Sequence, residues 1–328
     1  MKVKSITVQE WEEFVKSLPN YNFFQLPIWS QAYERTYPNC RIATRFFIFD
    51  DGIQVLVPLI ETRNKLGFRS YESLSGGGYG GFIWNKMPSN WQLKKILSYF
   101  FDLRASSLTI FPDPFDWQSH LFLEEEGFHA KEAFTHILNL DSDFGLVWAN
   151  RFDSKNRNQV RKALKSGVMI IPATNISEVK IYYDLYLESA HRWGAQEESI
   201  RPFRFFKNLF QIGGDKVRFY LAKYEEKYIS GAIIFYGDMN CFYWSSVLLK
   251  EYGKYCSNNL LLSNIIQSAC NDRYRFLNMG ASIGLPGVQR FKESFGAEKL
   301  NYKYFVYESL GLKLYKKMRL AFSLLRNS

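Results

Sequence analysis

The sequence predicts an α/β fold of the α+β type, with two lobes of similar design, each built on a mixed central sheet flanked by helices. Three observations support this prediction. The chain has 328 residues, which is more than one ordinary domain needs and suits two lobes of roughly 150 residues each. Apolar residues make up 47% of the chain, enough for a packed core in each lobe. Most importantly, the same order of predicted helices and strands occurs twice.

The first half begins with two helices. Thr7 is a typical N-cap residue for a helix over 8–18, and Pro27 suits the first position of a second helix over 27–37. Alternating apolar residues and turn signals then predict extended segments, including a pair joined by a turn at 50–52. The remaining predicted elements of this half are strands over 41–49, 53–61 and 68–76, a helix over 88–103, a strand over 106–111, a helix over 116–127 and a strand over 132–140.

The second half repeats this order. We predict helices over 153–166, 176–192 and 202–212, strands over 217–224, 228–237 and 240–248, a helix over 257–271, a strand over 274–280, a short helix over 288–296 and a strand over 301–308. Helices, an antiparallel meander and then alternating helices and strands are the layout of an acetyltransferase-like lobe. We therefore place the first lobe at 1–145 and the second at 146–328, with a basic amphipathic helix at its C-terminal end.

Composition excludes several classes of protein. The chain has no uninterrupted apolar segment of about 18 residues, the length that a membrane-spanning helix needs. The opening residues lack the apolar run of a secretory signal, so we expect a cytoplasmic protein. The four cysteines and four histidines lack the spacings of a zinc site or a disulfide framework, which indicates free thiols and no metal. A formal charge of +10 favours polyanionic partners, although a basic surface without such a partner has the same composition.

Two segments suggest anion binding, each with a structural alternative. The loop GGGYGG at 76–81 lacks the lysine and the following helix of a phosphate-binding loop, so a turn or the wall of a groove is the better interpretation. The predicted helix at 153–166 is either a solvated basic face or a contact for a polyanionic substrate. Its cations are Lys155, Arg157, Arg161, Lys162 and Lys165.

Two further segments could carry the chemistry of a reaction. Arg201 precedes Pro202 at a predicted helix start, so its guanidinium is expected on a loop, where it could hold a carboxylate or phosphate with Arg204 nearby. Lys292 follows a strand that ends in the glycine turn at Gly280. A fixed cation there would stabilise the oxyanion of an acyl transfer, whereas the alternative is a surface lysine on a short helix.

The sequence resembles the FemABX family, the non-ribosomal peptidyl transferases that build interpeptide bridges in bacterial cell walls. Four segments carry the resemblance, strongest between about 150 and 305: NFFQLPIW, SKNRNQVRKALKSGV, VRFYLAKYEEKYISGAIIFYGDMNCFYWSS and NMGASIGLPGVQRFKESFG. The resemblance implies two tandem acetyltransferase-type (GNAT) lobes. It also implies that Lys292 is the catalytic lysine, that Arg201 holds the acidic part of the acceptor and that Tyr255 lies at the acceptor groove.

The first-lobe signature of the family matches Gln25 and Trp29, with Trp29 expected in the core. We add Arg204, Phe291 and Tyr33 to the predicted substrate-binding residues because they neighbour these positions. Two departures from the family leave the acceptor open. The family's phosphate-binding lysine is absent from residues 30–33, and Asn278 replaces an acidic residue before the glycine turn.

The resemblance implies transfer of an aminoacyl group from charged tRNA to an amine of a peptidoglycan or related cell-envelope precursor, without a tightly bound cofactor. One alternative is an acyl-CoA-dependent N-acyltransferase acting on an amino sugar or small metabolite, although EYGKYCSNNLLL does not match the usual pyrophosphate loop. A non-catalytic binding protein is a third hypothesis. The C-terminal segment LGLKLYKKMRLAFSLLRN could contact the inner face of an anionic membrane or pack on its own lobe. The oligomeric state is not predicted.

Overall fold

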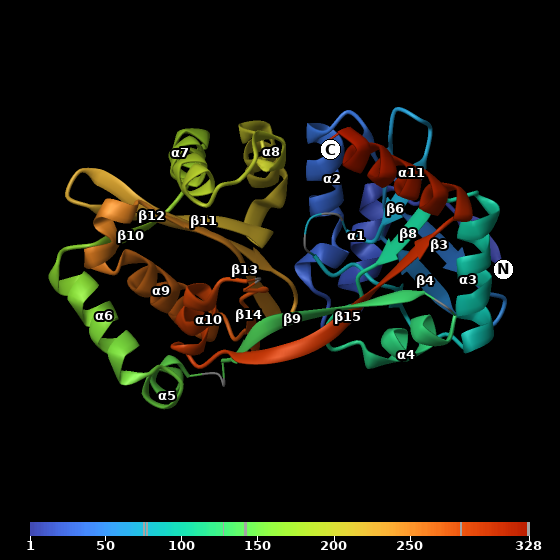
Figure 1. Ribbon diagram of the computed structural model, residues 1–328. Coiled ribbons are helices and arrows are strands. Elements are labelled where there is room, and N and C mark those ends of the chain that lie inside the picture. The colour runs from blue at the N-terminus through green and yellow to red at the C-terminus, as the bar shows by residue number, and fades with distance from the viewer. Residues whose placement is uncertain (75, 77, 127, 141–142, 283, 327–328) are drawn as a thin grey trace. The chain divides into compact units, whose positions relative to one another are not determined.

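The computed structural model describes residues 1–74, 76, 78–126, 128–140, 143–282 and 284–326, and Figure 1 shows the helices and strands they form. The chain divides into two units, which are described separately. Unit 1 comprises residues 1–18, 24–133 and 301–328, and unit 2 comprises residues 19–23 and 134–300.

Unit 1 contains two sheets. The order β1-β3-β4-β7 describes the first, which is antiparallel, and β15-β8-β6-β5-β2 describes the second, in which β6 and β8 run parallel. The elements are β1 (Lys2–Lys4), α1 (Val8–Lys16), η1 (Phe23–Gln25), α2 (Pro27–Thr36), β2 (Cys40–Ile42), β3 (Arg45–Ile48), β4 (Gln54–Val57), β5 (Ile60–Arg63), β6 (Arg69–Glu72), β7 (Ile83–Trp84), α3 (Asn90–Asp102), β8 (Ser107–Ile110), α4 (Trp117–Glu125), β15 (Glu298–Glu308) and α11 (Leu310–Arg326).

The start signals of the first two helices are confirmed. The Thr7 side chain accepts a hydrogen bond from the Glu10 backbone, and the Glu10 side chain bonds back to Thr7, forming a capping box. Pro27 is the first residue of α2, where its missing N–H costs nothing. Asn90–Asp102 likewise begins after a capping serine, Ser89.

Two of the predicted strands are each divided into two. The segment 41–49 forms β2 and β3, and 53–61 forms β4 and β5, with one half of each in each sheet. The division occurs at Ala43-Thr44 and at Pro58-Leu59, where the Leu59 N–H donates to the Thr44 side chain at 3.2 Å. Proline lacks a backbone N–H, so a change of sheet at Pro58 sacrifices no ladder hydrogen bond.

The chain passes between the units at four points, of which two lie inside strands. These are 133/134 inside β9 (His129–Asn139) and 300/301 inside β15, and the other two are 18/19 and 23/24. From the sequence we expected one join at 145/146 and residues 301–328 in the second lobe, whereas the structure groups 301–328 with unit 1. The reason is strand pairing, since β15 pairs antiparallel with β8 from Phe305 to Glu308, which no local pattern encodes.

Unit 2 has one sheet with the order β10-β11-β12-β13-β14-β9. Helices α7 and α8 cover one face of it, and α6 and α9 cover the other (Figure 1). The elements are α5 (Phe144–Asn150), α6 (Ser154–Lys165), β10 (Met169–Pro172), α7 (Ile176–Arg192), η2 (Glu197–Ser199), α8 (Phe203–Gly213), η3 (Gly214–Lys216), β11 (Val217–Tyr224), β12 (Lys227–Tyr236), β13 (Asn240–Leu248), η4 (Lys250–Tyr255), α9 (Ser257–Asn271), β14 (Phe276–Asn278) and α10 (Pro286–Glu293).

Each unit has its own core. In unit 1 the core includes Phe47 and Phe100, and in unit 2 it includes Tyr236 and Phe295. Three of the four free cysteines are buried, in agreement with the expectation of thiols that pack as apolar groups. Within the described part of the chain, no helix combines the length and the hydropathy needed to cross a membrane.

Candidate active site

The candidate site of unit 2 begins where two parallel strands separate. Strands β13 and β14 pair in parallel only from Asn240 to Phe242 on one strand and from Phe276 to Asn278 on the other. Beyond this point β13 continues to Leu248, whereas β14 ends and the chain turns at Gly280. Ligands of open sheets typically bind outside the carboxyl ends of parallel strands, so this fork is a favourable place for a substrate.

Lys292 lies over the turn that follows β14. It is on α10 and is 4% exposed, and its ammonium donates to the carbonyl oxygens of Gly280 at 2.9 Å and of Ala281 at 2.7 Å. A lysine ammonium has three N–H donors, so these two contacts fix its position and leave one donor for a ligand. The alternative of a surface lysine does not hold, because the side chain is buried.

Burial lowers the pKa of Lys292 from 10.5 to about 8. The cause is desolvation, which disfavours the charged form of an amine. At neutral pH the side chain is still mainly an ammonium. The site therefore holds a cation, poorly screened by water, whose charge is lost within the mildly alkaline range.

The turn itself is held by residues on both sides of it. Gly280 has a φ of +69°, in the left-handed region that favours glycine. Its N–H donates to Asn278 Oδ1 at 2.9 Å, and the same oxygen accepts from the Thr135 hydroxyl at 2.5 Å. Asn278, which departs from the family pattern, thus acts here as a neutral acceptor that braces the turn.

His136 is a further candidate, for which the sequence carries no local signal. It lies on β9 and is fully buried, and its Nδ1 is 3.4 Å from both the Gly280 carbonyl oxygen and Ser282 Oγ. Its Nε2 is buried and has no partner among the described residues. Burial and then the charge of Lys292 lower the pKa of His136, so the imidazole is neutral. Only strand pairing brings it to Lys292, so no spacing in the sequence could have indicated it.

Arg201 lies on the loop before α8, as its position next to Pro202 predicted. Its backbone N–H donates to the Tyr186 hydroxyl at 3.1 Å, and its guanidinium lies 5.1 Å from the Phe205 ring centre and 5.5 Å from that of Trp244. Aromatic faces hold a guanidinium by cation–π attraction. The half-buried Arg201 therefore has a restricted orientation over the face of the sheet that α7 and α8 cover.

An irregularity of β13 places Trp244 under this arginine. The register of β12 and β13 shifts so that Ile233 pairs with Ser245 and Ile234 with Tyr243, which leaves Trp244 as the extra residue. A β-bulge of this kind lets two successive side chains face the same side of the sheet. Trp244 and Ser245 both contact the α7–α8 layer, through Phe206 and Tyr182 respectively.

Lys292 and Arg201 are related through β13. An added Cβ on Gly280 would lie 3.5 Å from the tip of the Phe242 ring, so the glycine turn is next to Phe242. Trp244, next to Arg201, is two residues farther along the same strand. The two predicted residues therefore belong to one region of unit 2, beside the carboxyl halves of β13 and β14.

The other predicted residues of unit 2 differ in their surroundings. Tyr255, at the end of η4, stacks on Tyr224 with ring centres 4.1 Å apart, at the carboxyl end of β11. The ring centres of Phe291 and Phe295 are 5.2 Å apart, and Phe291 packs against the core of unit 2, which is a structural role. Arg204 is exposed on α8. Their assignment to the substrate remains a prediction.

The predicted residues of unit 1 are mostly buried. Tyr33 is 6% exposed and packs between Trp29 and Tyr37 on α2, and Trp29 is fully buried, as expected for the core. The Gln25 backbone carbonyl accepts a hydrogen bond from the Trp11 indole at 2.7 Å. These contacts give Tyr33 and Gln25 a packing role in unit 1, and their contact with the substrate stays a prediction.

The basic helix combines both interpretations offered for it. Arg157 donates to the carbonyl oxygens of Trp148 and Ala149, so it caps the C-terminal end of α5. Four other cations of α6 are exposed: Lys155, Arg161, Lys162 and Lys165. Arg161 lies 5.6 Å from the Trp148 ring centre. An exposed basic face with a neighbouring aromatic remains available for a polyanion.

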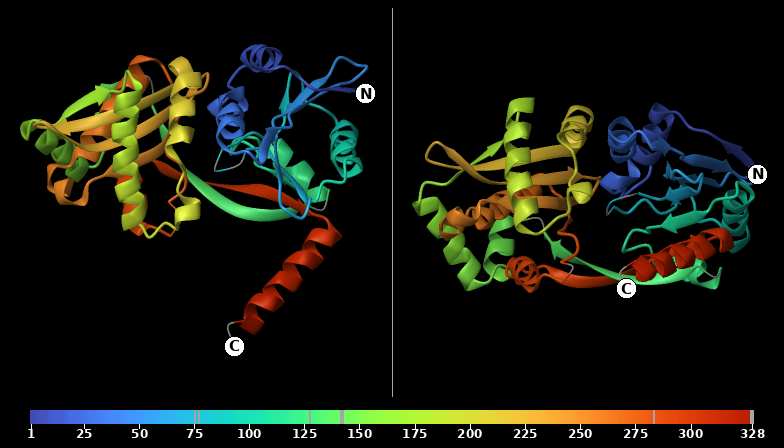
Figure 2. Two further views of the ribbon diagram at one scale, coloured as in Figure 1. Left: turned by 90° about the horizontal axis from the view of Figure 1, so that it is seen from above. Right: turned by 45° about the horizontal axis from the view of Figure 1, so that its top comes forward.

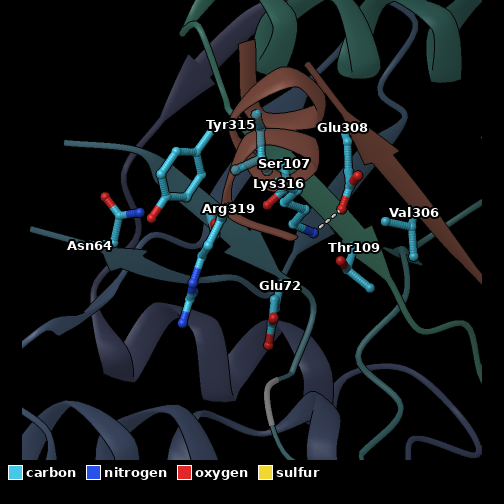
Figure 3. Close-up of a pocket in the computed structure, with 11 residues that line it drawn as sticks. Asn64, Glu72, Ser107, Thr109, Val306, Glu308, Tyr315, Lys316 and Arg319 are labelled. Atoms are coloured by element: carbon cyan, nitrogen blue, oxygen red, sulfur yellow. Dashed lines mark hydrogen bonds and ion pairs between the residues drawn. The ribbon is translucent and has the colours of Figure 1, made fainter. Parts of the chain in front are cut away.

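Unit 1 contains a separate pocket of about 620 Å³ between its second sheet and α11 (Figure 3). Its charged lining consists of Glu72, Glu308, Lys316 and Arg319, of which Lys316 and Glu308 form an ion pair. The Glu72 side chain comes from β6 and the Arg319 side chain from α11 (Figure 3). The opposite charges offset one another, and the pocket includes none of the predicted site residues.

Comparisons with known proteins identify the type of domain and of fold. Residues 150–293 match the family model described as an acetyltransferase (GNAT) domain. The crystal structure of FemX superposes with a TM-score of 0.78 and 18% identity over 96% of this chain and 99% of that one. The protein is an acyltransferase with the FemX fold. The fold that the resemblance to FemABX proteins implies, two tandem GNAT-type lobes, is thereby confirmed. The match over residues 150–293 bears out the predicted enzyme class.

Two other structures share the fold of this acyltransferase. The C-terminal domain of a putative lysylphosphatidylglycerol synthetase from Agrobacterium fabrum has a TM-score of 0.60 and 10% identity over 95% of this chain and 96% of that one. A tandem GNAT protein from the clavulanic acid biosynthesis pathway has a TM-score of 0.54 and 12% identity, covering 92% and 94%. A comparison with curated protein sequences gave no match.

Proposed function

We propose that the acyltransferase moves an aminoacyl group from charged tRNA to an amine of a peptidoglycan or related cell-envelope precursor. One observation carries the proposal, the buried ammonium of Lys292 held over the glycine turn by the Gly280 and Ala281 carbonyl oxygens. The likeness to FemX supports it, and so does the likeness to a putative lysylphosphatidylglycerol synthetase, a name that denotes an aminoacylated product.

In the proposed reaction the acceptor amine attacks the ester carbonyl that joins the amino acid to the tRNA ribose. The carbonyl oxygen becomes an oxyanion, to which the third N–H of Lys292 donates. The ester C–O bond then breaks, the ribose oxygen leaves as a hydroxyl after taking a proton, and the attacking nitrogen loses its proton to form the amide. Removing one such oxyanion donor typically costs roughly 10²- to 10³-fold in rate.

Two further features support anionic substrates. The guanidinium of Arg201, oriented by Phe205 and Trp244, suits a carboxylate or phosphate held by two parallel hydrogen bonds. The exposed cations of α6 suit the phosphates of an RNA stem, for which salt-dependent affinity is the expected signature.

The direct test is transfer by the full chain from tRNA carrying a labelled amino acid to a peptidoglycan nucleotide precursor. We expect the precursor to gain the mass of one aminoacyl residue, and the gain to disappear after treatment of the tRNA with ribonuclease. Lys292→Met should slow the gain roughly 10²- to 10³-fold, and Lys299→Met, a matched exposed lysine, should keep it. Transfer from acetyl-CoA with none from charged tRNA would contradict the proposal.

The match of residues 150–293 to an acetyltransferase model favours one competing function, acyl-CoA-dependent N-acylation of an amino sugar or small metabolite. The two functions differ at α6. Lys162→Glu/Lys165→Glu should weaken a tRNA-dependent reaction strongly at low salt, because phosphate contacts are lost. The same variant should leave acyl-CoA-dependent transfer near the wild-type rate.

A further inference from the structure

One face of α11 exposes a row of apolar side chains. Leu310, Leu314 and Met318 are 79%, 62% and 60% exposed. Residues four positions apart lie on the same side of a helix, so these three form a single stripe. Isolated exposed leucines are common on protein surfaces, whereas a stripe of this regularity typically marks an interaction surface.

The opposite face of α11 is already used for packing on unit 1. Leu312 is 7% exposed, the Tyr315 ring lies 5.3 Å from that of Phe68, and Lys316 forms an ion pair with Glu308. The helix is therefore held by one side while the stripe points away. The left view of Figure 2 shows its C-terminal part extending away from the other elements of unit 1.

The charge of α11 indicates what covers the stripe. Residues 310–326 contain five cations and no acidic residue. Lys313 and Lys317 directly neighbour the stripe in sequence, so cations and apolar side chains share one side of the helix. Lys317 is exposed, and Lys313 is half-buried with its Nζ 3.4 Å from His129 Nε2. A second copy of the helix would meet it with like charge, which disfavours self-association through this face. An anionic lipid surface matches both properties, since it offers negative headgroups above an apolar layer.

We propose that α11 docks on an anionic membrane surface, with Leu310, Leu314 and Met318 inserted at the headgroup boundary and Lys313 and Lys317 at the lipid phosphates. The helix lies in the interface and does not cross the bilayer. The inference is independent of the acyl donor, because α11 belongs to unit 1 whereas Lys292 belongs to unit 2. It would bring the enzyme to the surface where lipid-linked acceptors are held.

Flotation of the full chain with lipid vesicles tests the proposal. We expect binding to vesicles of phosphatidylcholine and phosphatidylglycerol, and little binding to phosphatidylcholine alone. Leu314→Asp/Met318→Asp should lower the partition coefficient about tenfold or more, because two apolar contacts are lost and two negative charges face the lipid. Leu164→Asp is the matched control, since Leu164 is 58% exposed on the basic helix α6, and it should bind like the unchanged protein.

A charge variant completes the test. Lys313→Glu/Lys317→Glu should lower binding to the anionic vesicles about tenfold or more and leave the weak binding to neutral vesicles unchanged. Circular dichroism would establish that each variant is folded. Equal flotation of Leu314→Asp/Met318→Asp and the unchanged protein would overturn the proposal. So would a dimer of the unchanged protein, seen by light scattering, that this variant converts to a monomer.

Discussion

Two glycine-rich turns of this molecule differ in what surrounds them. In unit 1, the described glycines of the loop at 76–81 approach the chain itself: a Cβ on Gly78 would lie 2.5 Å from the Phe24 ring, and one on Gly80 would lie 2.8 Å from the Ser73 carbonyl oxygen. In unit 2, a Cβ on Gly280 would meet, among the residues that the structure describes, only Phe242, at an ordinary 3.5 Å. The first turn is closed by packing, whereas the second carries carbonyl oxygens that hold a buried ammonium.

The comparison teaches that glycine content does not identify a binding loop. The loop with more glycines uses them for close approach of core side chains, which is a structural role. The turn with fewer glycines uses the left-handed φ of Gly280 to point a carbonyl oxygen at the Lys292 ammonium. The proposed chemistry depends on the cation that the second turn holds. Variants of the first turn should therefore change the stability of the protein, and variants of the second turn should change the reaction rate.

The largest effect is expected at Lys292. Lys292→Met removes the cation over the Gly280 turn and should lower kcat roughly 10²- to 10³-fold in the transfer assay. Lys299→Met, on an exposed lysine, should keep the rate. A Lys292→Met variant with the wild-type rate would show that the second turn, like the first, has only a structural role.

The same substitution should not destabilise the fold. Because the folded-state pKa of Lys292 is lowered from 10.5 to about 8, burial of its charge costs on the order of 3 kcal/mol below pH 8. This cost disappears as pH rises from 8 to 10.5, so the stability of the unchanged protein should increase over that range. Lys292→Met should lack this increase and melt at the same or a higher temperature at pH 7, as thermal denaturation would measure.

Arg201 should have the next largest effect. Arg201→Ala removes a charge-assisted contact to the substrate and should lower kcat/KM about tenfold to a hundredfold. Arg204→Ala should lower kcat/KM less than Arg201→Ala does, because Arg204 is exposed on α8 and its side chain is less restricted in orientation. Equal losses of kcat/KM in the two variants would show that Arg201, despite its aromatic contacts, contributes no more to substrate binding than Arg204 does.

The pH dependence of the reaction rate tests whether the ammonium form of Lys292, which the second turn holds, is the active form. Since the ammonium form of Lys292 stabilises the oxyanion, the rate should fall above about pH 8 as the lysine loses its proton. Lys292→Arg stays charged throughout, so any residual activity should lack this alkaline decline. A rate that instead rises through pH 8 with the same pKa would indicate that neutral Lys292 acts as a base.

The glycines themselves should give the smallest effects. Gly78→Ala should destabilise unit 1 by about 1–3 kcal/mol because its Cβ overlaps the Phe24 ring, with an unchanged rate per folded molecule. Gly280→Ala should cost roughly 1–2 kcal/mol because of its positive φ, and it should also lower the rate by shifting the carbonyl that holds Lys292. Denaturant titration and the transfer assay measure both quantities.

The sequence by itself determined the local structure. Thr7, Pro27 and Pro202 mark helix starts that occur at or within one residue of those positions, because capping and the fixed φ of proline act over a few residues. The repeated order of elements, together with the segments that resemble FemABX proteins, predicted the tandem GNAT-type fold. It also singled out Lys292, whose placement over a turn after a strand is as expected.

Tertiary structure decided what depends on pairing between distant segments. His136 reaches the Gly280 turn only because β9 pairs with β14, and the part of β15 from residue 301 belongs to unit 1 because it pairs with β8. Trp244 lies beneath Arg201 because of a register shift between β12 and β13. Pairing and register minimise the free energy of the whole sheet, whereas caps and periodicity act on neighbouring residues. For that reason the sequence predicted the elements and the lysine, and only the folded chain assembled the surroundings that lower the pKa of Lys292.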